Sequence, residues 1–208
     1  MKLCTRTTYL NICSESLYVV HLLINPAICV RWVTRQHVHV DRVASPWLIS
    51  KFVDKDAEFI FVPWPGPLPT ENMGIPFDFP GADFELGHHD GKCTFEAIVE
   101  KYNIKDPWVH EIAKIVHAAD ISKDIDKAPE ARGLEAIAAG AMYLVKDDYE
   151  ALEKGFFIYD ALYVYVQLKK IREEYKEELA KMDRAKRFEF INSKIKLPPE
   201  AEVRRPQK

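Results

Sequence analysis

Two short stretches of the 208-residue chain collect side chains that bind metals or move protons. The stretch GHHDGKCTFE places two adjacent histidines and a cysteine ahead of a glutamate. The stretch HAAD puts a histidine and an aspartate three positions apart, which makes them neighbours on one helix surface. Imidazole and carboxylate ligands suit iron, manganese and zinc. We therefore predict a site for a divalent or trivalent metal ion (Fe, Mn or Zn) built from His88, His89, Glu96, His117 and Asp120.

The paired histidines are not expected to act alike. Gly87 and Gly91 allow the chain to turn tightly around them. Side chains of adjacent residues point in opposite directions in an extended segment, so we expect either His88 or His89 to bind and the other to lie beside the site. The spacing is less specific than an HExxH helix, and a half-buried His117 paired with its own helical carboxylate is the structural alternative.

Cys93 and the H-x-H pair each have more than one interpretation. Cys93 is a soft metal ligand, a redox-active thiol near the site, or a small apolar residue at a helix start. His37 and His39 lie on one face if their segment is a strand, where they form either a metal-binding pair or, as we prefer, the polar face of an edge strand.

Arg35, Asp41 and Arg42 are the best candidates for binding an anionic substrate. Two guanidinium groups, together with backbone N–H groups at a helix start, hold an oxyanion such as chromate or sulfate. An internal Asp–Arg ion pair that organises the turn explains the same residues equally well.

The composition indicates a folded protein without a general affinity for polyanions. Hydrophobic residues make up 48% of the chain and aromatic residues 12%, which is enough for a core. The net charge of −3 gives no attraction to nucleic acid or to an anionic membrane. Four cysteines, without a CxxC pair, predict neither a disulfide framework nor a zinc clip, so we expect a reducing, cytoplasmic environment and no membrane span.

Hydrophobic periodicity predicts an α+β, mainly helical fold, with a small N-terminal sheet packed against a bundle of about four to five helices. A proline-rich loop over 63–76 follows the second strand and is expected to lack regular structure. Thr94 is the expected cap of the first of the later helices. The predicted strands are Arg31–Asp41 and Glu58–Val62, and the predicted helices are Trp47–Val53 (started by Ser45-Pro46), Phe95–Tyr102, Trp108–Asp120 (started by Asp106-Pro107), Ala131–Tyr143 and Asp147–Met182.

The chain divides into three parts by composition. Residues 31–190 form the expected domain, and residues 191–208, with Pro198-Pro199 and a basic end, are expected to be a flexible tail. Residues 1–30 are an extension for which we weigh a mis-assigned start before Val30 and a weak signal-like segment, the latter implying export.

The segments VDRVASPWLISKFVD, AEFIFV, ELGHHDGKCTFEAIV and IVHAAD, in this order, resemble the chromate-resistance domains that form the C-terminal part of ChrB proteins. The resemblance covers about residues 31–167, most of the chain. In that family the first segment commonly has a cysteine where this chain has Ser45.

The resemblance implies a role in chromate detoxification or response, and by motif position it implicates Asp41, Arg42, His88, Glu96, His117 and Asp120. We expect a metal-binding domain; the alternative is a module that senses a chromate-like or sulfate-like oxyanion without metal or catalysis. If the protein is an enzyme, a metal-dependent redox or hydrolytic reaction is implied. DNA binding, which in the family involves an additional N-terminal region, is not expected of this chain.

Overall fold

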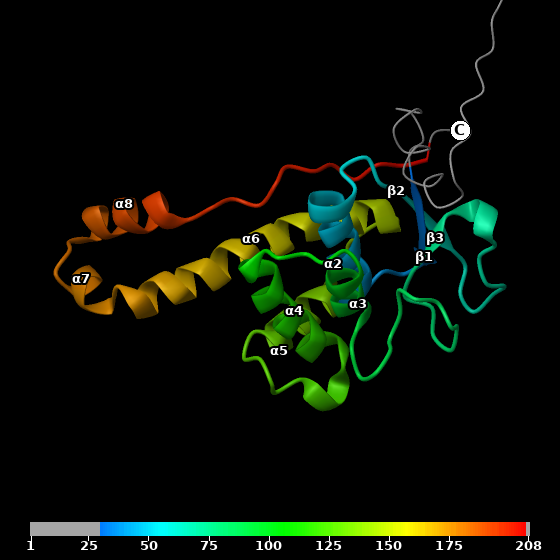
Figure 1. The fold of residues 1–208 in the computed structure, drawn as a ribbon, viewed down its shortest axis with the longest axis horizontal. Helices are drawn as coiled ribbons and strands as arrows, with labels where there is room; N and C mark the ends of the chain where they lie inside the picture. The colour runs from blue at the N-terminus through cyan, green and yellow to red at the C-terminus, as the bar shows by residue number, and fades with distance from the viewer. Residues whose placement is uncertain (1–29, 207–208) are drawn as a thin grey trace, which may run out of the picture.

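A three-stranded parallel sheet lies beside a packed group of helices in this computed structural model, which describes residues 30–206 (Figure 1). The predicted α+β, mainly helical class is confirmed. The strand order is β2-β1-β3. The strands are β1 (Arg31–Arg35), β2 (Glu58–Val62) and β3 (Ile75–Pro76), and the helices are α2 (Val40–Leu48), α3 (Thr94–Lys101), α4 (Pro107–Asp120), α5 (Ala131–Ala141), α6 (Asp148–Glu174), α7 (Lys176–Ala180) and α8 (Arg184–Lys194).

The strand predicted over Arg31–Asp41 is wrong in its second half, because β1 ends at Arg35 and α2 begins at Val40. His37, with a φ of 61°, lies in the turn between them, so the H-x-H pair is not on a strand face. Apolar residues at helical spacing outweigh the short alternation of HVHV. These residues, all buried, are Val40, Val43, Ala44, Trp47 and Leu48.

The helix start predicted at Ser45-Pro46 is also wrong, because both residues lie inside α2. Proline lacks the N–H that would continue the helical hydrogen bonding. The last turn of this segment is a π-helical turn, Ile49–Val53. In the loop predicted to lack regular structure, a 3-10 turn (Glu71–Met73) precedes β3, which pairs with β1.

Trp47 joins α2 to α3 and α6 in the middle of the core. Its fully buried ring stacks against Phe95 with the ring centroids 6.5 Å apart, and it lies 6.1 Å from the ring of Tyr159. The indole N–H donates to Asp160 at 2.8 Å, which satisfies its one polar atom. The side chain of Trp47 thus packs against both α3 and α6.

Gly155 allows α6 to lie close against α2. A Cβ atom at this position would be 2.4 Å from Cγ1 of Val43, well inside van der Waals contact. The nearby hydroxyl of Tyr159 donates to the carbonyl of Val40 at 2.8 Å. This close approach holds the first turn of α2, and with it Asp41, in a fixed position.

The predicted start of α4 is confirmed: Asp106 is the N-cap, its carboxylate accepts the N–H groups of Trp108 and Val109, and Pro107 is the first helical residue. The expected cap of α3 is wrong. Cys93 is the N-cap, and Thr94 is already in the first turn. The Thr94 hydroxyl donates instead to Asp78 at 3.3 Å.

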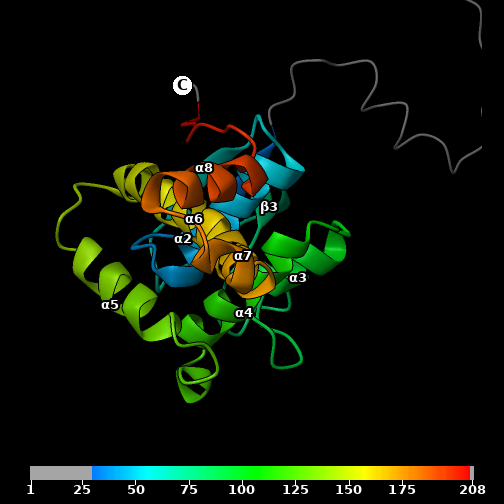
Figure 2. The ribbon, with the colours of Figure 1, turned by 90° about the vertical axis from the view of Figure 1, so that its left-hand side faces the viewer.

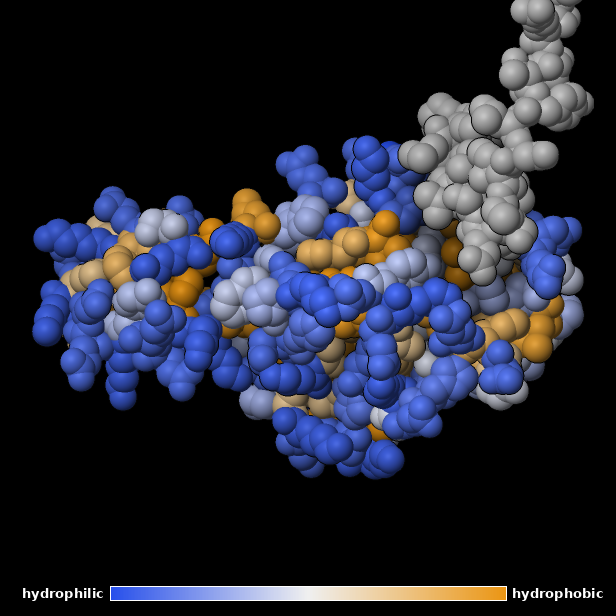
Figure 3. All heavy atoms as spheres, in the orientation of Figure 1, coloured by the Kyte–Doolittle hydropathy of each residue, from blue (hydrophilic) through white to orange (hydrophobic). Residues whose placement is uncertain are grey.

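The helix predicted over Asp147–Met182 breaks at Tyr175, and α7 and α8 turn back beside the end of α6 (Figures 1 and 2). We expected a flexible tail over 191–208, but α8 continues to Lys194. The chain then runs back toward the sheet (Figure 1), where the Phe59 N–H donates to the carbonyl of Arg204 at 3.4 Å. The surface of the α7–α8 end is mainly hydrophilic on the face in Figure 3.

Residues 1–29, and with them nearly all of the proposed N-terminal extension and its signal-like interpretation, lie outside the described residues. Between residues 30 and 206, none of the helices has the length and apolar character needed to cross a bilayer.

Candidate functional site

Asp41 connects the start of α2 to the start of α3. Its buried carboxylate accepts the backbone N–H of Thr94 at 2.7 Å and that of Phe95 at 3.0 Å, in addition to the hydroxyl of Ser45 at 2.9 Å. These N–H groups belong to the first turn of α3, where no carbonyl of the same helix is available to them. A carboxylate from another helix therefore caps α3, and it brings a negative charge to the positive end of that helix.

Asp78, in the loop after β3, is held by two arginines. Its Oδ2 atom lies 2.9 Å from Nη1 of Arg42 and 3.2 Å from Nη2 of Arg35, while Oδ1 accepts the hydroxyl of Thr94. Burial disfavours the charged form of this carboxylate. The hydrogen bond with His88 and the two guanidinium groups outweigh burial and lower the pKa of Asp78 below its usual value.

The imidazole of His88 faces three carboxylates at once. Its Nε2 atom lies 3.2 Å from Asp120, 3.3 Å from Asp78 and 3.7 Å from Asp41. The hydrogen bond with Asp78, together with the negative charges of Asp41 and Asp120, raises the pKa of His88 to about 9 against the effect of burial. His88 is half exposed, so this group of four residues, which we call the carboxylate–histidine cluster, is open to solvent on one side.

The carboxylates of this cluster repel one another. Burial, followed by the charges of Asp120 and Asp78, raises the pKa of Asp41 to about 8. Burial also raises the pKa of Asp120, and the charge of Asp78 adds to this effect. A cation at the centre of the cluster would relieve both the burial of charge and the repulsion.

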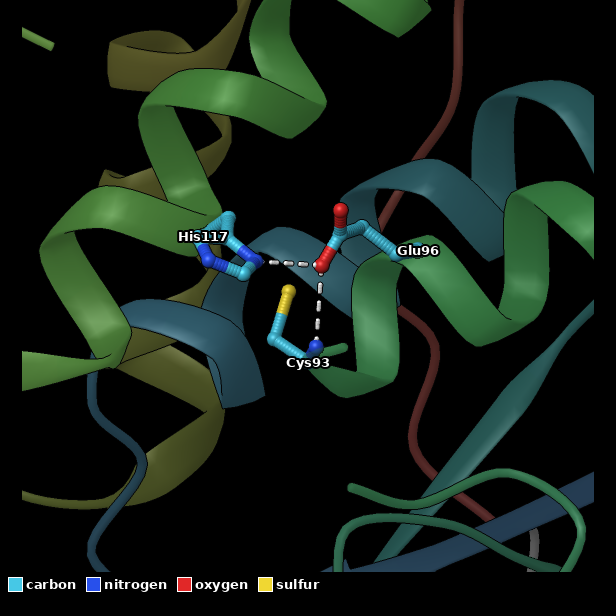
Figure 4. A group of neighbouring side chains, drawn as sticks. All are labelled: Cys93, Glu96 and His117. Atoms are coloured by element: carbon cyan, nitrogen blue, oxygen red, sulfur yellow. Dashed lines mark hydrogen bonds and ion pairs between the residues drawn. The ribbon is translucent and has the colours of Figure 1, made fainter. Parts of the chain in front are cut away.

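A second group, which we call the thiol cluster, contains Cys93, Glu96, His117 and Asp124. One donor atom from each of the first three lies within 4.8 Å of the other two. Figure 4 shows Oε2 of Glu96 between the backbone N–H of Cys93, at 3.0 Å, and Nδ1 of His117, at 2.6 Å. The other imidazole nitrogen, Nε2, lies 2.8 Å from Oδ2 of Asp124.

The protonation of the thiol cluster follows from these contacts. Although burial favours the neutral imidazole, the hydrogen bonds with Glu96 and Asp124 raise the pKa of His117. Burial raises the pKa of the Cys93 thiol, and the charge of Asp41 adds to it. Without a cation, this cluster therefore favours an imidazolium and a neutral thiol.

The residues predicted as a single metal site are divided between the two clusters. His88 meets Asp120, whereas Glu96 meets His117. The two helical residues of the HAAD stretch thus point to different partners. His89 joins neither group of close contacts, because its Nε2 atom lies 2.5 Å from the carbonyl of Phe84. Of the adjacent histidines, His88 is the one that faces the carboxylates.

The residues predicted to bind an anion are engaged within the protein. Both guanidinium groups contact Asp78, and each has a second bond: Nε of Arg35 donates to the Asp78 carbonyl and Nη2 of Arg42 to the His37 carbonyl. The carboxylate of Asp41 accepts backbone N–H groups at the start of α3. The ion pair considered as the alternative exists, but its acid is Asp78 and not Asp41.

Asp78 and Asp124 were not identified as site residues from the sequence. Asp78 lies in the segment FDFPGAD, among proline and glycine, where no helical or strand period indicates which way a side chain points. Asp124 is seven residues after His117, beyond the end of α4, and a 3-10 turn (Ser122–Asp124) brings it back to the helix. Only a search for every acid near the HAAD stretch would have found it.

Comparison with known proteins places all of these residues in one matched region. A family model described as "ChrB, C-terminal domain" matches residues 32–166. Protein ChrB of Cupriavidus metallidurans is 32% identical over 136 residues, which is 65% of this chain and 40% of the relative. The chain therefore spans less than half the length of this relative. No solved structure matches the chain.

Proposed function

This chain belongs to the family of the ChrB C-terminal domain, and from this premise we propose that it acts in chromate resistance as a metal-binding domain. The proposed ligands are the four residues of the carboxylate–histidine cluster, Asp41, Asp78, His88 and Asp120. The link to chromate rests on the family resemblance, and the metal site rests on the geometry of these four side chains.

The main support for the metal site is the number of carboxylate acceptors around the single Nε2 atom of His88. An Nε2–H group donates a single hydrogen, yet carboxylate oxygens from three residues lie within 3.7 Å of this one nitrogen. Asp41 and Asp78 accept further donors from the start of α3, from Ser45 and from the two arginines, but only one carboxylate can accept the single hydrogen of His88 Nε2, and the carboxylates remain close to like charges. A metal ion bound by the imidazole and the carboxylates satisfies all of them together.

The donor set favours manganese or iron over zinc. Three carboxylates and one imidazole offer mostly hard oxygen ligands and no sulfur. A bound ion would supply Lewis acidity or, as iron or manganese, a change of oxidation state.

The surrounding residues orient the ligands for a cation, and the positive charge of the resulting complex would attract an anion. Arg35 and Arg42 fix one oxygen of Asp78, which leaves its other oxygen directed at His88. The three carboxylates exceed the two guanidinium groups by one negative charge, so a divalent ion makes the whole group positive. Because His88 is half exposed, an oxyanion would have access from solvent.

The test is metal analysis of the full chain purified without a histidine tag. We expect about one equivalent of manganese or iron in the wild type, and its loss in both His88→Ala and Asp120→Ala. The matched control is His89→Ala, which removes the neighbouring imidazole that contacts Phe84 instead. Retention of metal in the two cluster variants, or equal loss in His89→Ala, would contradict the site.

A thermal shift measurement tests the oxyanion-sensing alternative. If metal-free wild-type protein is stabilised by chromate or sulfate, the module binds the anion without metal. If chromate stabilises only the metal-loaded protein, the proposed function is supported.

A further inference from the structure

We propose that the thiol cluster is a second metal site, for zinc or a similar ion that accepts sulfur, with Cys93 Sγ, Glu96 Oε and His117 Nδ1 as its ligands. Asp124 acts as the residue that orients His117. The proposal does not depend on an ion in the carboxylate–histidine cluster, because the two groups share no side chain.

The donor atoms are already close to coordinating positions. Tetrahedral zinc, with bonds of about 2.0–2.3 Å, needs donor atoms roughly 3.3–3.8 Å apart. The three donors here lie within 4.8 Å of one another, and all three side chains point into the same space in Figure 4. A movement of about 1 Å, within the reach of small side-chain rotations, completes the arrangement. The fourth position remains for water or a small anion.

The second observation is the contact behind His117. A metal-binding histidine donates the N–H of its other ring nitrogen to a carboxylate or carbonyl, which fixes the tautomer and the ring. His117 has this arrangement: Nε2 faces Asp124 at 2.8 Å, and Asp124 is held in turn by Lys127 at 2.9 Å. A proton on Nε2 leaves the lone pair of Nδ1 directed at Cys93 and Glu96.

The start of α3 supports a thiolate at Cys93. The side chain of Cys93 accepts the backbone N–H of Glu96 in a capping box, so it lies at the positive end of the helix. Ion binding displaces the thiol proton and the proton on Nδ1, and both pass to solvent. The thiolate is then stabilised by the ion and by the helix N-terminus together.

The two clusters differ in the ions they suit. The carboxylate–histidine cluster offers oxygen and one nitrogen, whereas the thiol cluster offers sulfur, nitrogen and oxygen. Sulfur ligands select zinc and related ions over magnesium, calcium or manganese. The chain therefore presents a hard site and a softer site on the two sides of the start of α3.

The test is a cobalt(II) titration of the EDTA-treated full chain in the presence of a phosphine reductant. Cobalt bound to a thiolate gives a charge-transfer band in the near ultraviolet, and oxygen ligands do not. We expect this band at about one equivalent in the wild type, its loss in Cys93→Ser, and its displacement by zinc. Asp120→Asn, in the other cluster, should retain it.

Three further variants test whether the band and the affinity come from the proposed ligands. The chain has other cysteines at positions 4, 13 and 29, so a variant with these three changed to serine must keep the band. If Cys93→Ser fails to fold, Glu96→Gln retains an acceptor for the Cys93 N–H while weakening the ligand set, and it should reduce cobalt affinity at least about tenfold. Asp124→Asn should weaken affinity by about 10–100-fold without removing the band.

The absence of a thiolate band in the wild type, or its persistence in Cys93→Ser, would overturn the proposal. This result is separate from the metal analysis of the carboxylate–histidine cluster. Loss of manganese or iron in Asp120→Ala without a thiolate band would leave the proposed function intact and reject only the second site. A thiolate band, together with a manganese or iron content that Asp120→Ala leaves unchanged, would support the second site and reject the metal site of the carboxylate–histidine cluster.

Discussion

Oδ2 of Asp41 accepts the backbone N–H of Thr94 at 2.7 Å, across 53 residues of sequence. This bond ties the first turn of α2 to the first turn of α3, and it directs the same carboxylate toward His88. Assembly of the carboxylate–histidine cluster and initiation of α3 therefore depend on the same side chain.

Replacement of Asp41 by alanine should destabilise the metal-free protein by about 2–3 kcal/mol, because two buried N–H groups and the Ser45 hydroxyl lose their acceptor. Asp41→Asn keeps one acceptor oxygen and should cost about half as much. Urea denaturation in EDTA measures both variants. A loss below about 0.5 kcal/mol in Asp41→Ala would show that water or another group replaces the cap.

The metal-free protein should lose stability as pH rises from about 6.5 to about 9. The pKa of His88 is raised from 6.5 to about 9 in the folded state, so the native protein holds more protons than the unfolded chain in this window. The stabilisation is fully present below pH 6.5 and is lost through pH 9. The raised pKa of Asp41 acts in the same direction from about pH 4 to about pH 8 and so overlaps the lower part of this window, and the raised pKa of Asp120 also acts in this direction.

Denaturation midpoints in EDTA at a series of pH values test this dependence, with His88→Gln as the comparison. The facing groups, Asp41, Asp78 and Asp120, with Arg35 and Arg42 behind them, are unchanged in that variant. The decline above pH 8 should be much smaller in His88→Gln. An equal decline in both proteins would assign the titration to another group.

Gly155→Ala should destabilise the protein although alanine favours helices. The propensity gain is about 1 kcal/mol, whereas a Cβ atom 2.4 Å from Val43 forces overpacking that costs about 1–3 kcal/mol. A double-mutant cycle with Val43→Ala separates the two effects. If Gly155→Ala is stabilising in the presence of Val43, the close approach of α6 to α2 is not as described.

The segment after α8 should be released by Gln167→Leu. The buried amide of Gln167 exchanges two hydrogen bonds with the backbone of Lys196, at 2.8 and 2.9 Å. Their loss lowers the cost of local opening by about 1.4 kcal/mol, which corresponds to about tenfold faster tryptic cleavage at Lys194 and Lys196. Lys169→Gln, on the same helix, should leave the rate unchanged; equal acceleration in both would indicate general loosening of α6.

Local signals predicted much of the fold. Asp106-Pro107 marked the start of α4 because a capping acid and a proline define a helix N-terminus by themselves. EFIFV marked β2 with its observed bounds. The start of α2 was missed because HVHV alternates like a strand, and only packing against α6 and α3 decides between the two periods.

The candidate site was harder to predict, because contacts between distant segments determine it. Helical spacing placed His117 beside Asp120, but their partners come from the start of α3 and from the histidine loop. No local pattern specifies that Asp78 meets Arg35 and Arg42, or that Asp41 caps a helix more than 50 residues away.

Cys93 belongs to one cluster, and Thr94, the next residue, touches the other through Asp41 and Asp78. One peptide unit thus underlies both sets of ligands. A slight tilt of α3 about its first turn changes the separation of sulfur from imidazole on one side and of carboxylate from carboxylate on the other. If both proposed sites bind ions, an ion at one site should therefore change the donor distances at the other through this shared peptide unit, although neither site needs the other to form.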